Sequence, residues 1–149
     1  MTLSERINKD IVDYMKNKDS FSLGVVRMVK GAIQLEKINL KRELNDDEVI
    51  AVIGKQIKMR NDSISEFEKA NRSDLVDQYK KEIELLSKYM PEQLSLEEIN
   101  KIIDEAFASI NPTSTKDMGL IMREVSPKLK GRADMAKVNA IIKEKLANL

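Results

Sequence analysis

Three cations lie within five residues near the C-terminal end of this sequence: Lys128, Lys130 and Arg132, with only Asp134 against them. Gly131 can take the left-handed conformation that ends a helix, and Asp134 is well placed to cap the next one. We call residues 126–134 the basic corner. We expect this turn to project at least two of its cations into solvent, where lysine and arginine neutralise phosphate groups. The chemistry that this stretch suggests is the binding of a polyanion.

Three further residues extend this candidate site. Lys116 is expected at the start of the preceding helix and Lys137 in the first turn of the last helix, so that both flank the corner. Asn139 either offers a neutral donor or ties the corner to the closing helix. The predicted nucleic-acid-binding residues are therefore Lys116, Lys128, Lys130, Arg132, Lys137 and Asn139. The alternative is a solvated turn in which Gly131 and Asp134 only cap helices.

No catalytic site is predicted. The chain has no histidine and no cysteine, which removes the commonest base at neutral pH, a common nucleophile and the strongest metal ligands. No serine is followed by lysine three positions later, and Gly54-Lys55 lacks the upstream glycine of a phosphate loop. The acidic run Asp46–Glu48 is interpreted as the first turn of a helix rather than a metal site. We expect no cofactor and no metal.

The composition favours an all-α protein. Hydrophobic residues make up 42% of the chain, aromatic residues only 4%, and there are three prolines. No apolar stretch approaches the ~20 residues of a membrane span, and no signal-peptide pattern is present. The expected location is the cytoplasm, with no membrane partner. Residues 113–149 hold eight basic against four acidic residues, and the rest of the chain holds 18 against 21, which suggests an anionic partner for the tail.

Helical periodicity predicts two bundles, of about four helices and then three, that must position the candidate residues. Caps are expected at Thr2, at Asp19 or Ser20, at Asn45 and at Ser73, and later at Ser95, Ser114 and Asp134. Pro91 disfavours a helix through Met90. We predict an N-terminal bundle over residues 1–90, a hinge at 91–94 and a C-terminal three-helix domain over 95–149.

The second helix carries two features that suggest contact with neighbours. Gly24 and Gly31 lie seven residues apart on one side, where another helix would approach closely. Arg27 sits beside the apolar positions, and we expect it to pair with a carboxylate from another helix.

The tail of the chain resembles a known family. It contains, in order, Lys116-Asp117-Met118-Gly119, Pro127-Lys128, Gly131-Arg132-Ala133-Asp134, Val138-Asn139 and Ile142-Lys143-Glu144-Lys145-Leu146. This order resembles the YqeY-like family (GatB/YqeY), which shares its C-terminal region with the tail of the B subunit of the glutamyl/aspartyl-tRNA amidotransferase. The resemblance covers nearly the whole chain and implies two all-α bundles whose tail contacts tRNA. Arg72-Ser73-Asp74-Leu75 departs from the arginine–aspartate–leucine signature of the family by the interposed serine, which leaves the role of Arg72 open.

Two functions from different classes follow. The first is a non-catalytic helical module that binds tRNA through the basic corner. The second is a protein-interaction adaptor whose N-terminal bundle docks on a partner enzyme, or an accessory to a tRNA amidotransferase. The family resemblance also implies the activity of a carbon–nitrogen ligase with glutamine as amido donor. That activity belongs to the larger complex rather than to these residues. Salt dependence separates the first two functions, because phosphate binding weakens steeply with salt.

Overall fold

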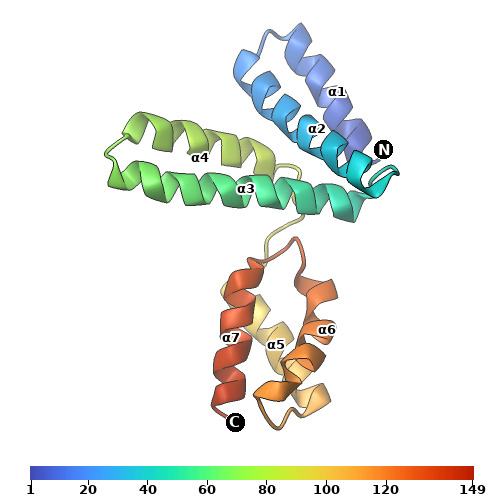
Figure 1. Ribbon diagram of the computed structural model, residues 1–149, viewed down its shortest axis with the longest axis vertical. Coiled ribbons are helices and arrows are strands. Elements are labelled where there is room, and N and C mark those ends of the chain that lie inside the picture. Colours follow the sequence, from blue (N-terminus) through green and yellow to red (C-terminus); the bar gives the residue numbers. More distant parts are fainter. The chain divides into compact units, whose positions relative to one another are not determined.

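The computed structural model describes all of residues 1–149 and confirms the predicted all-α fold. Seven α-helices and one short 3-10 helix make up the chain, with no strand. Figure 1 shows their order. Their bounds are α1 (Leu3–Lys16), α2 (Ser20–Leu40), α3 (Asp46–Lys69), α4 (Ser73–Ser87), α5 (Leu96–Ile110), η1 (Thr115–Asp117), α6 (Met118–Leu129) and α7 (Met135–Ala147).

The contacts within the chain divide it into two compact units, Met1–Met90 and Pro91–Leu149. No helix runs through Pro91, because α4 ends at Ser87 and α5 begins at Leu96. Helices α1–α4 form the first unit, and α5, η1, α6 and α7 form the second. None of the helices combines the length and the apolar character that crossing a membrane would require.

Most helices begin at the predicted caps. The Thr2 side chain accepts from the Glu5 backbone N–H while the Glu5 carboxylate accepts from Thr2, and Asn45 and Glu48 repeat this reciprocal arrangement. Arg42 also donates two hydrogen bonds of 2.7 Å to Glu48. The arginine and the backbone of Asn45 together lower the pKa of Glu48 to about 2. The capping patterns therefore determined where α1 and α3 start.

Helix α4 starts differently from the expectation. Ser73 is its first residue rather than its cap, and Arg72 holds the cap position without a side-chain hydrogen bond to the helix backbone. The Arg72 guanidinium instead donates two hydrogen bonds of 3.1 Å to the Asp74 carboxylate. Arg72 thus has a local partner at the start of α4.

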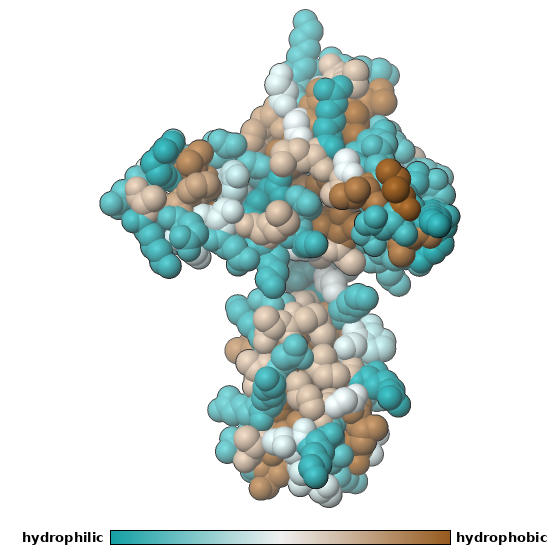
Figure 2. Space-filling model, viewed as in Figure 1, coloured by the Kyte–Doolittle hydropathy of each residue, from teal (hydrophilic) through white to brown (hydrophobic).

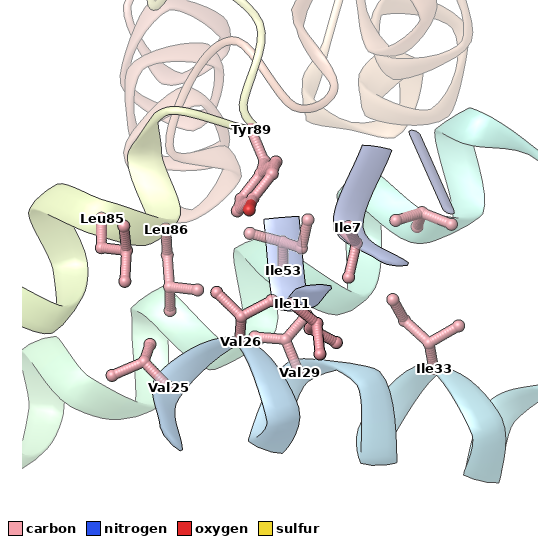
Figure 3. Close-up of a cluster of buried hydrophobic side chains, with 11 residues drawn as sticks. Ile7, Ile11, Val25, Val26, Val29, Ile33, Ile53, Leu85, Leu86 and Tyr89 are labelled. Atoms are coloured by element: carbon pink, nitrogen blue, oxygen red, sulfur yellow. The ribbon is translucent and has the colours of Figure 1, made fainter. Parts of the chain in front are cut away.

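The core of the first unit is formed by apolar stripes from all four helices. Figure 3 shows these side chains pointing toward one another from α1, α2, α3 and the end of α4. The buried cluster comprises Ile7, Ile11, Val25, Val26, Val29, Ile33, Val49, Ile53, Leu85, Leu86 and Tyr89. Since burying each large apolar side chain contributes about 1.5–3 kcal/mol, this cluster supplies most of the driving force for the unit.

A tyrosine ties α1 to the end of α4. The hydroxyl of buried Tyr89 donates to the Asp10 carboxylate at 2.5 Å, and the Arg6 guanidinium lies 4.8 Å from the centre of the Tyr89 ring. Arg6 also donates to the Lys88 carbonyl at 3.2 Å. Burial and the Asp10 carboxylate both raise the pKa of Tyr89, so the hydroxyl stays protonated and keeps donating.

A buried ion pair joins α3 to α4. Arg60 Nε donates to Glu82 Oε1 at 3.1 Å, and the two side chains are 6% and 7% exposed. Gln78 donates to the second Glu82 oxygen, and the Gln56 side-chain oxygen accepts from Arg60. Both charges are thus hydrogen-bonded, which is what a buried charge requires.

Two expectations for the second helix are wrong within this chain. Arg27 is exposed and pairs with no carboxylate; its Nη2 lies 3.7 Å from the Met15 sulfur. A Cβ added at Gly24 or Gly31 would meet no atom within 4 Å, so no neighbouring helix of this chain approaches them. Periodicity places these residues on one side of α2, but it does not say whether a neighbour covers that side.

The buried pair yields a first prediction. Replacing Glu82 by leucine leaves the Arg60 charge buried and unpaired, so we expect the free energy of unfolding of the first unit to fall by about 3–5 kcal/mol. The double replacement Arg60→Met with Glu82→Leu removes both charges and should recover most of that loss. Urea unfolding followed by tyrosine fluorescence measures this specifically, because all three tyrosines (Tyr14, Tyr79 and Tyr89) lie in the first unit. Equal destabilisation by the single and double replacements would contradict the prediction.

Candidate nucleic-acid interface

Three helices of the second unit position the candidate residues. Their buried stripes meet in one core, with Ile103 from α5, Ile121, Val125 and Leu129 from α6, and Val138 and Ile142 from α7, all without exposed area. Within this unit α6 and α7 run in opposite directions, and the corner connects them (Figure 1). The packing of α6 and α7 therefore fixes the two ends of the corner.

Helix α6 extends further into the corner than the sequence suggests. It includes Pro127 and ends at Leu129, so Lys128 lies in its last turn rather than in a loop. Proline inside a helix loses one backbone hydrogen bond and clashes with the preceding turn. Here the cost is offset, because Leu129 is fully buried in the core and holds the last turn in place.

The turn after α6 has the predicted capping. Gly131 takes φ 78°, in the left-handed region, and the Asp134 side chain accepts from the Ala136 backbone N–H at 3.0 Å. Lys130 ends the helix with its N–H bonded to Ser126, and the Arg132 N–H bonds to the Leu129 carbonyl at 2.9 Å. Gly131 and Asp134 therefore do serve as caps, whatever else the corner does.

The segment 92–94 is hydrogen-bonded to the corner, and the sequence did not predict this contact. The Leu94 N–H donates to the Arg132 carbonyl at 2.9 Å, and the Gln93 side chain donates to the Gly131 carbonyl at 2.9 Å. Arg132 Nε in turn donates to the Glu92 carbonyl at 3.4 Å. Leu94 also packs against the core of the unit. No periodic pattern marks these contacts, because they join segments far apart in the sequence through backbone groups.

These contacts bear on the predicted hinge at 91–94. Gln93 and Leu94 are bonded to the corner, and they belong structurally to the second unit. With the Glu92 carbonyl also accepting from Arg132, only Pro91 in this segment has no hydrogen bond to the corner. Whether the chain bends there stays a prediction.

All six candidate residues are exposed. Lys128 lies 3.5 Å from the Glu124 carboxylate one turn earlier in α6, an exposed pair that contributes little. Lys130, Arg132 and Lys137 pair with no carboxylate of this chain, and the carboxylate of Asp134 is occupied as a helix cap. The corner thus presents a concentration of positive charge that the protein itself does not neutralise.

The structure brings together only part of the predicted set. Lys128, Lys130 and Arg132 surround the turn, and Lys137 lies in the first turn of α7 beside it. Asn139 is exposed on α7 and makes no hydrogen bond to the corner, which leaves it free as a donor.

Lys116 lies elsewhere. It belongs to η1, before the start of α6, and the rise of about 1.5 Å per residue puts it roughly 18 Å from the corner along that helix. Beside it, the Thr113 backbone N–H donates to Asp117 at 2.8 Å and lowers the pKa of that carboxyl. Lys116 therefore has an anionic neighbour in sequence and does not flank the corner.

Besides the exposed corner, the second unit has a surface hollow on α5. This hollow, of about 800 Å³, is lined by one face of α5 alone, from Leu96 to Ala108. No group of three or more acidic, histidine or cysteine side chains is arranged to hold a metal ion. The corner remains the candidate site.

Comparison with known proteins gives the family context. A family model described as "Yqey-like protein" matches residues 4–146. The chain is 28% identical over 130 residues to "Altered inheritance of mitochondria protein 41, mitochondrial" of Pyrenophora tritici-repentis, an alignment that covers 86% of this chain and 71% of that protein. Proteins of the same name are 31% identical over 88 residues in Candida glabrata and 33% identical over 84 residues in Kluyveromyces lactis. These two alignments cover 58% and 56% of this chain, but only 48% and 45% of the relatives.

The same comparison contradicts the cytoplasmic location expected from the sequence. The relatives from all three fungi are named as mitochondrial proteins. The expectation rested on what the sequence lacks, namely a membrane span and a signal-peptide pattern, and those absences do not distinguish the cytoplasm from the interior of an organelle.

The capping glycine yields a second prediction. Alanine at position 131 would have to adopt a positive φ, which costs about 1–2 kcal/mol. Gly131→Ala should lower the stability of the second unit by this amount and speed hydrogen exchange of the Leu94 amide. Gly119→Ala is the matched control, because Gly119 lies in a helix with open space around an added Cβ and should gain about 0.4–1 kcal/mol.

Urea unfolding followed by circular dichroism, with the tyrosine signal reporting the first unit separately, measures both changes. A stability loss for Gly119→Ala as large as that for Gly131→Ala would show that the positive φ is not the cause.

Proposed function

The chain belongs to the family of YqeY-like proteins, and on that premise we propose that it is a non-catalytic module that binds the backbone of tRNA through its basic corner. The observation that carries the proposal is the corner itself, where Lys130 and Arg132 pair with no carboxylate and lie on a turn that hydrogen bonds hold from both sides. A family model alone does not select RNA as the ligand; the charge and geometry of this turn favour it.

Hydrogen bonding prepares the corner for binding. The backbone of residues 130–132 is bonded to the end of α6 and to Gln93 and Leu94. A ligand that binds there orders only the ends of the lysine side chains, rather than a loop. Since each ordered long side chain costs about 0.5–1.5 kcal/mol, a backbone that is already ordered preserves affinity.

The corner favours recognition of phosphates rather than of bases. Phe107 in α5 is the one aromatic residue of the second unit, and Lys145 lies 5.7 Å from the centre of its ring. Single-stranded bases are read by stacking on exposed aromatic side chains, and the corner has none. We therefore infer that the module recognises the shape and backbone of a folded RNA.

The geometry revises the residues expected to take part. Lys128, Lys130, Arg132 and Lys137 form the binding group, with Asn139 as a neutral donor nearby. Lys116 participates only if the RNA extends along α6 by roughly 18 Å. The accessory role beside a glutamine-dependent tRNA amidotransferase is compatible with this binding and adds a partner enzyme.

The main prediction concerns the charges of the corner. Replacing Lys128, Lys130 and Arg132 by alanine should weaken tRNA binding by more than tenfold at low salt. The slope of log affinity against log salt should fall by just under one unit for each phosphate that is no longer neutralised. Fluorescence anisotropy with labelled tRNA at several salt concentrations measures both quantities.

A matched variant separates this local effect from the change in net charge. Lys58→Ala, Lys80→Ala and Lys81→Ala together remove the same charge from exposed positions of the first unit. This control should bind tRNA nearly as the parent does. If the parent protein binds no tRNA, or if the two triple variants bind equally well, the proposal is wrong.

A further prediction concerns chemistry. The purified protein should release no ammonia from glutamine and should amidate no charged tRNA, because the chain lacks histidine, cysteine, a Ser-x-x-Lys arrangement and a phosphate loop. A coupled assay for ammonia measures the first activity. Ammonia release that tracks the pure protein, and that a point substitution in it abolishes, would overturn the prediction.

A further inference from the structure

Helix α2 has two apolar faces, although the core buries only one. Val25, Val26, Val29 and Ile33 point into the first unit. On the opposite side Phe21, Met28, Leu35 and Ile38 are 42%, 59%, 61% and 70% exposed. Gly24 and Gly31 lie between them. We call Phe21, Gly24, Met28, Gly31, Leu35 and Ile38 the outer stripe. Figure 2 shows hydrophobic side chains on the surface in the region of α2, among hydrophilic ones.

The spacing of the outer stripe is that of a helix-pairing seam. Its residues alternate steps of three and four, which is the a/d pattern by which one helix packs against another. A helix on the surface of a protein normally turns charged and polar residues to the solvent on this side. Contiguous exposed apolar surface of this kind marks interaction sites.

At its two glycines the outer stripe has no side chain, and no contact within this chain requires glycine there. Each glycine inside a helix costs about 0.8–1.0 kcal/mol relative to alanine. A Cβ at either position would meet open space, so no internal contact requires the glycines. The glycines interrupt the row of side chains formed by Phe21, Met28 and Leu35 at two positions, where a facing helix can approach the backbone of α2. We call these two positions the hollows.

One edge of the outer stripe is basic and unpaired. The 3.6-residue turn places Arg27 and Gln34 along this edge, and Lys41, the C-cap residue that follows α2, lies near Gln34. Neither Arg27 nor Lys41 pairs with a carboxylate of this chain. The other arginines of the unit all have partners: Arg6 bonds to a carbonyl, and Arg42, Arg60 and Arg72 pair with carboxylates. The only acidic residue of α2, Glu36, lies on the other side of the stripe.

We propose that the outer stripe seats an amphipathic helix of another protein, whose large apolar residues fill the hollows at Gly24 and Gly31 and whose acidic edge faces Arg27 and Lys41. This surface is separate from the basic corner, and the proposal goes beyond RNA binding. The chemistry of the partner is set by both features, since the hollows require a helix and the basic edge requires Asp or Glu.

A second copy of this chain fits the outer stripe less well. In an antiparallel pairing of two α2 helices, the same edges of the two helices face each other, so Arg27 and Lys41 of one copy would meet those of the other. Like charges at such positions are repulsive. A lipid surface also fits less well, because it gains nothing from the hollows that the two glycines leave.

The test uses two synthetic helical peptides of 21 residues, the length of α2. Both carry leucine at the a and d positions, and one carries glutamate along its edges where the other carries lysine. The glutamate peptide should bind the full-length protein at least about tenfold more tightly than the lysine peptide. Leu35→Glu, and separately Gly31→Leu, should each weaken this binding at least about tenfold. Both positions are exposed, and tyrosine fluorescence checks that the first unit stays folded.

A charge reversal makes the test specific for the basic edge. Arg27→Glu with Lys41→Glu should invert the preference, so that the lysine peptide binds more tightly. Lys58→Glu with Lys80→Glu makes the same change of charge elsewhere on the unit and should leave the preference unchanged. The alanine replacements in the basic corner should also leave it unchanged, which separates this proposal from RNA binding.

Four results would overturn the proposal. They are failure of the glutamate peptide to bind, equal binding of the two peptides, an unchanged preference after the charge reversal, and binding of labelled tRNA that Arg27→Glu with Lys41→Glu abolishes. Two further results would assign the surface to another occupant and would also overturn it. One is a dimer in sedimentation that Leu35→Glu dissolves, and the other is binding to phosphatidylserine vesicles that Leu35→Glu abolishes.

Discussion

An α-helix uses its backbone hydrogen bonds internally, so helices can be joined only through side chains and through the groups left free at their ends. This constraint governs the whole protein, which has no sheet to connect distant segments. Each helix must bury its apolar stripe against others, and the second unit does so with six fully buried aliphatic side chains from α5, α6 and α7. Helix α2 departs from the rule, because it has a second apolar stripe that its own unit leaves uncovered.

Hydrogen bonds and ion pairs are directional, and they fix the arrangement of the helices and the linker more precisely than apolar packing alone. In the first unit these contacts are the buried pair of Arg60 and Glu82 and the hydrogen bond from Tyr89 to Asp10. The core of the second unit contains no buried polar side chain. There the directional contacts lie at the edge, where the backbone of Leu94 and the side chain of Gln93 bond to the corner.

This difference connects stability with the candidate function. The hydrogen bonds that hold the end of the linker are the same ones that hold the backbone beneath Lys130 and Arg132. A ligand bound by these cations would therefore be joined to the linker through a short path of hydrogen bonds. Affinity for a polyanion depends on how many phosphates the side chains reach, and a fixed backbone keeps the cations in reach together.

The sequence by itself determined the helical class, the family, the starts of most helices and the capping roles of Gly131 and Asp134. These features depend on neighbours within a few residues, which composition, spacing and capping chemistry report directly. Only the tertiary structure decided that Gln93 and Leu94 support the corner, that Lys116 lies roughly 18 Å from it, and that α6 continues through Pro127. It also decided that Arg27 pairs with no carboxylate and that Gly24 and Gly31 face open space. Each of these outcomes depends on which distant segment packs against a given helix face, and periodicity identifies a face without identifying what covers it.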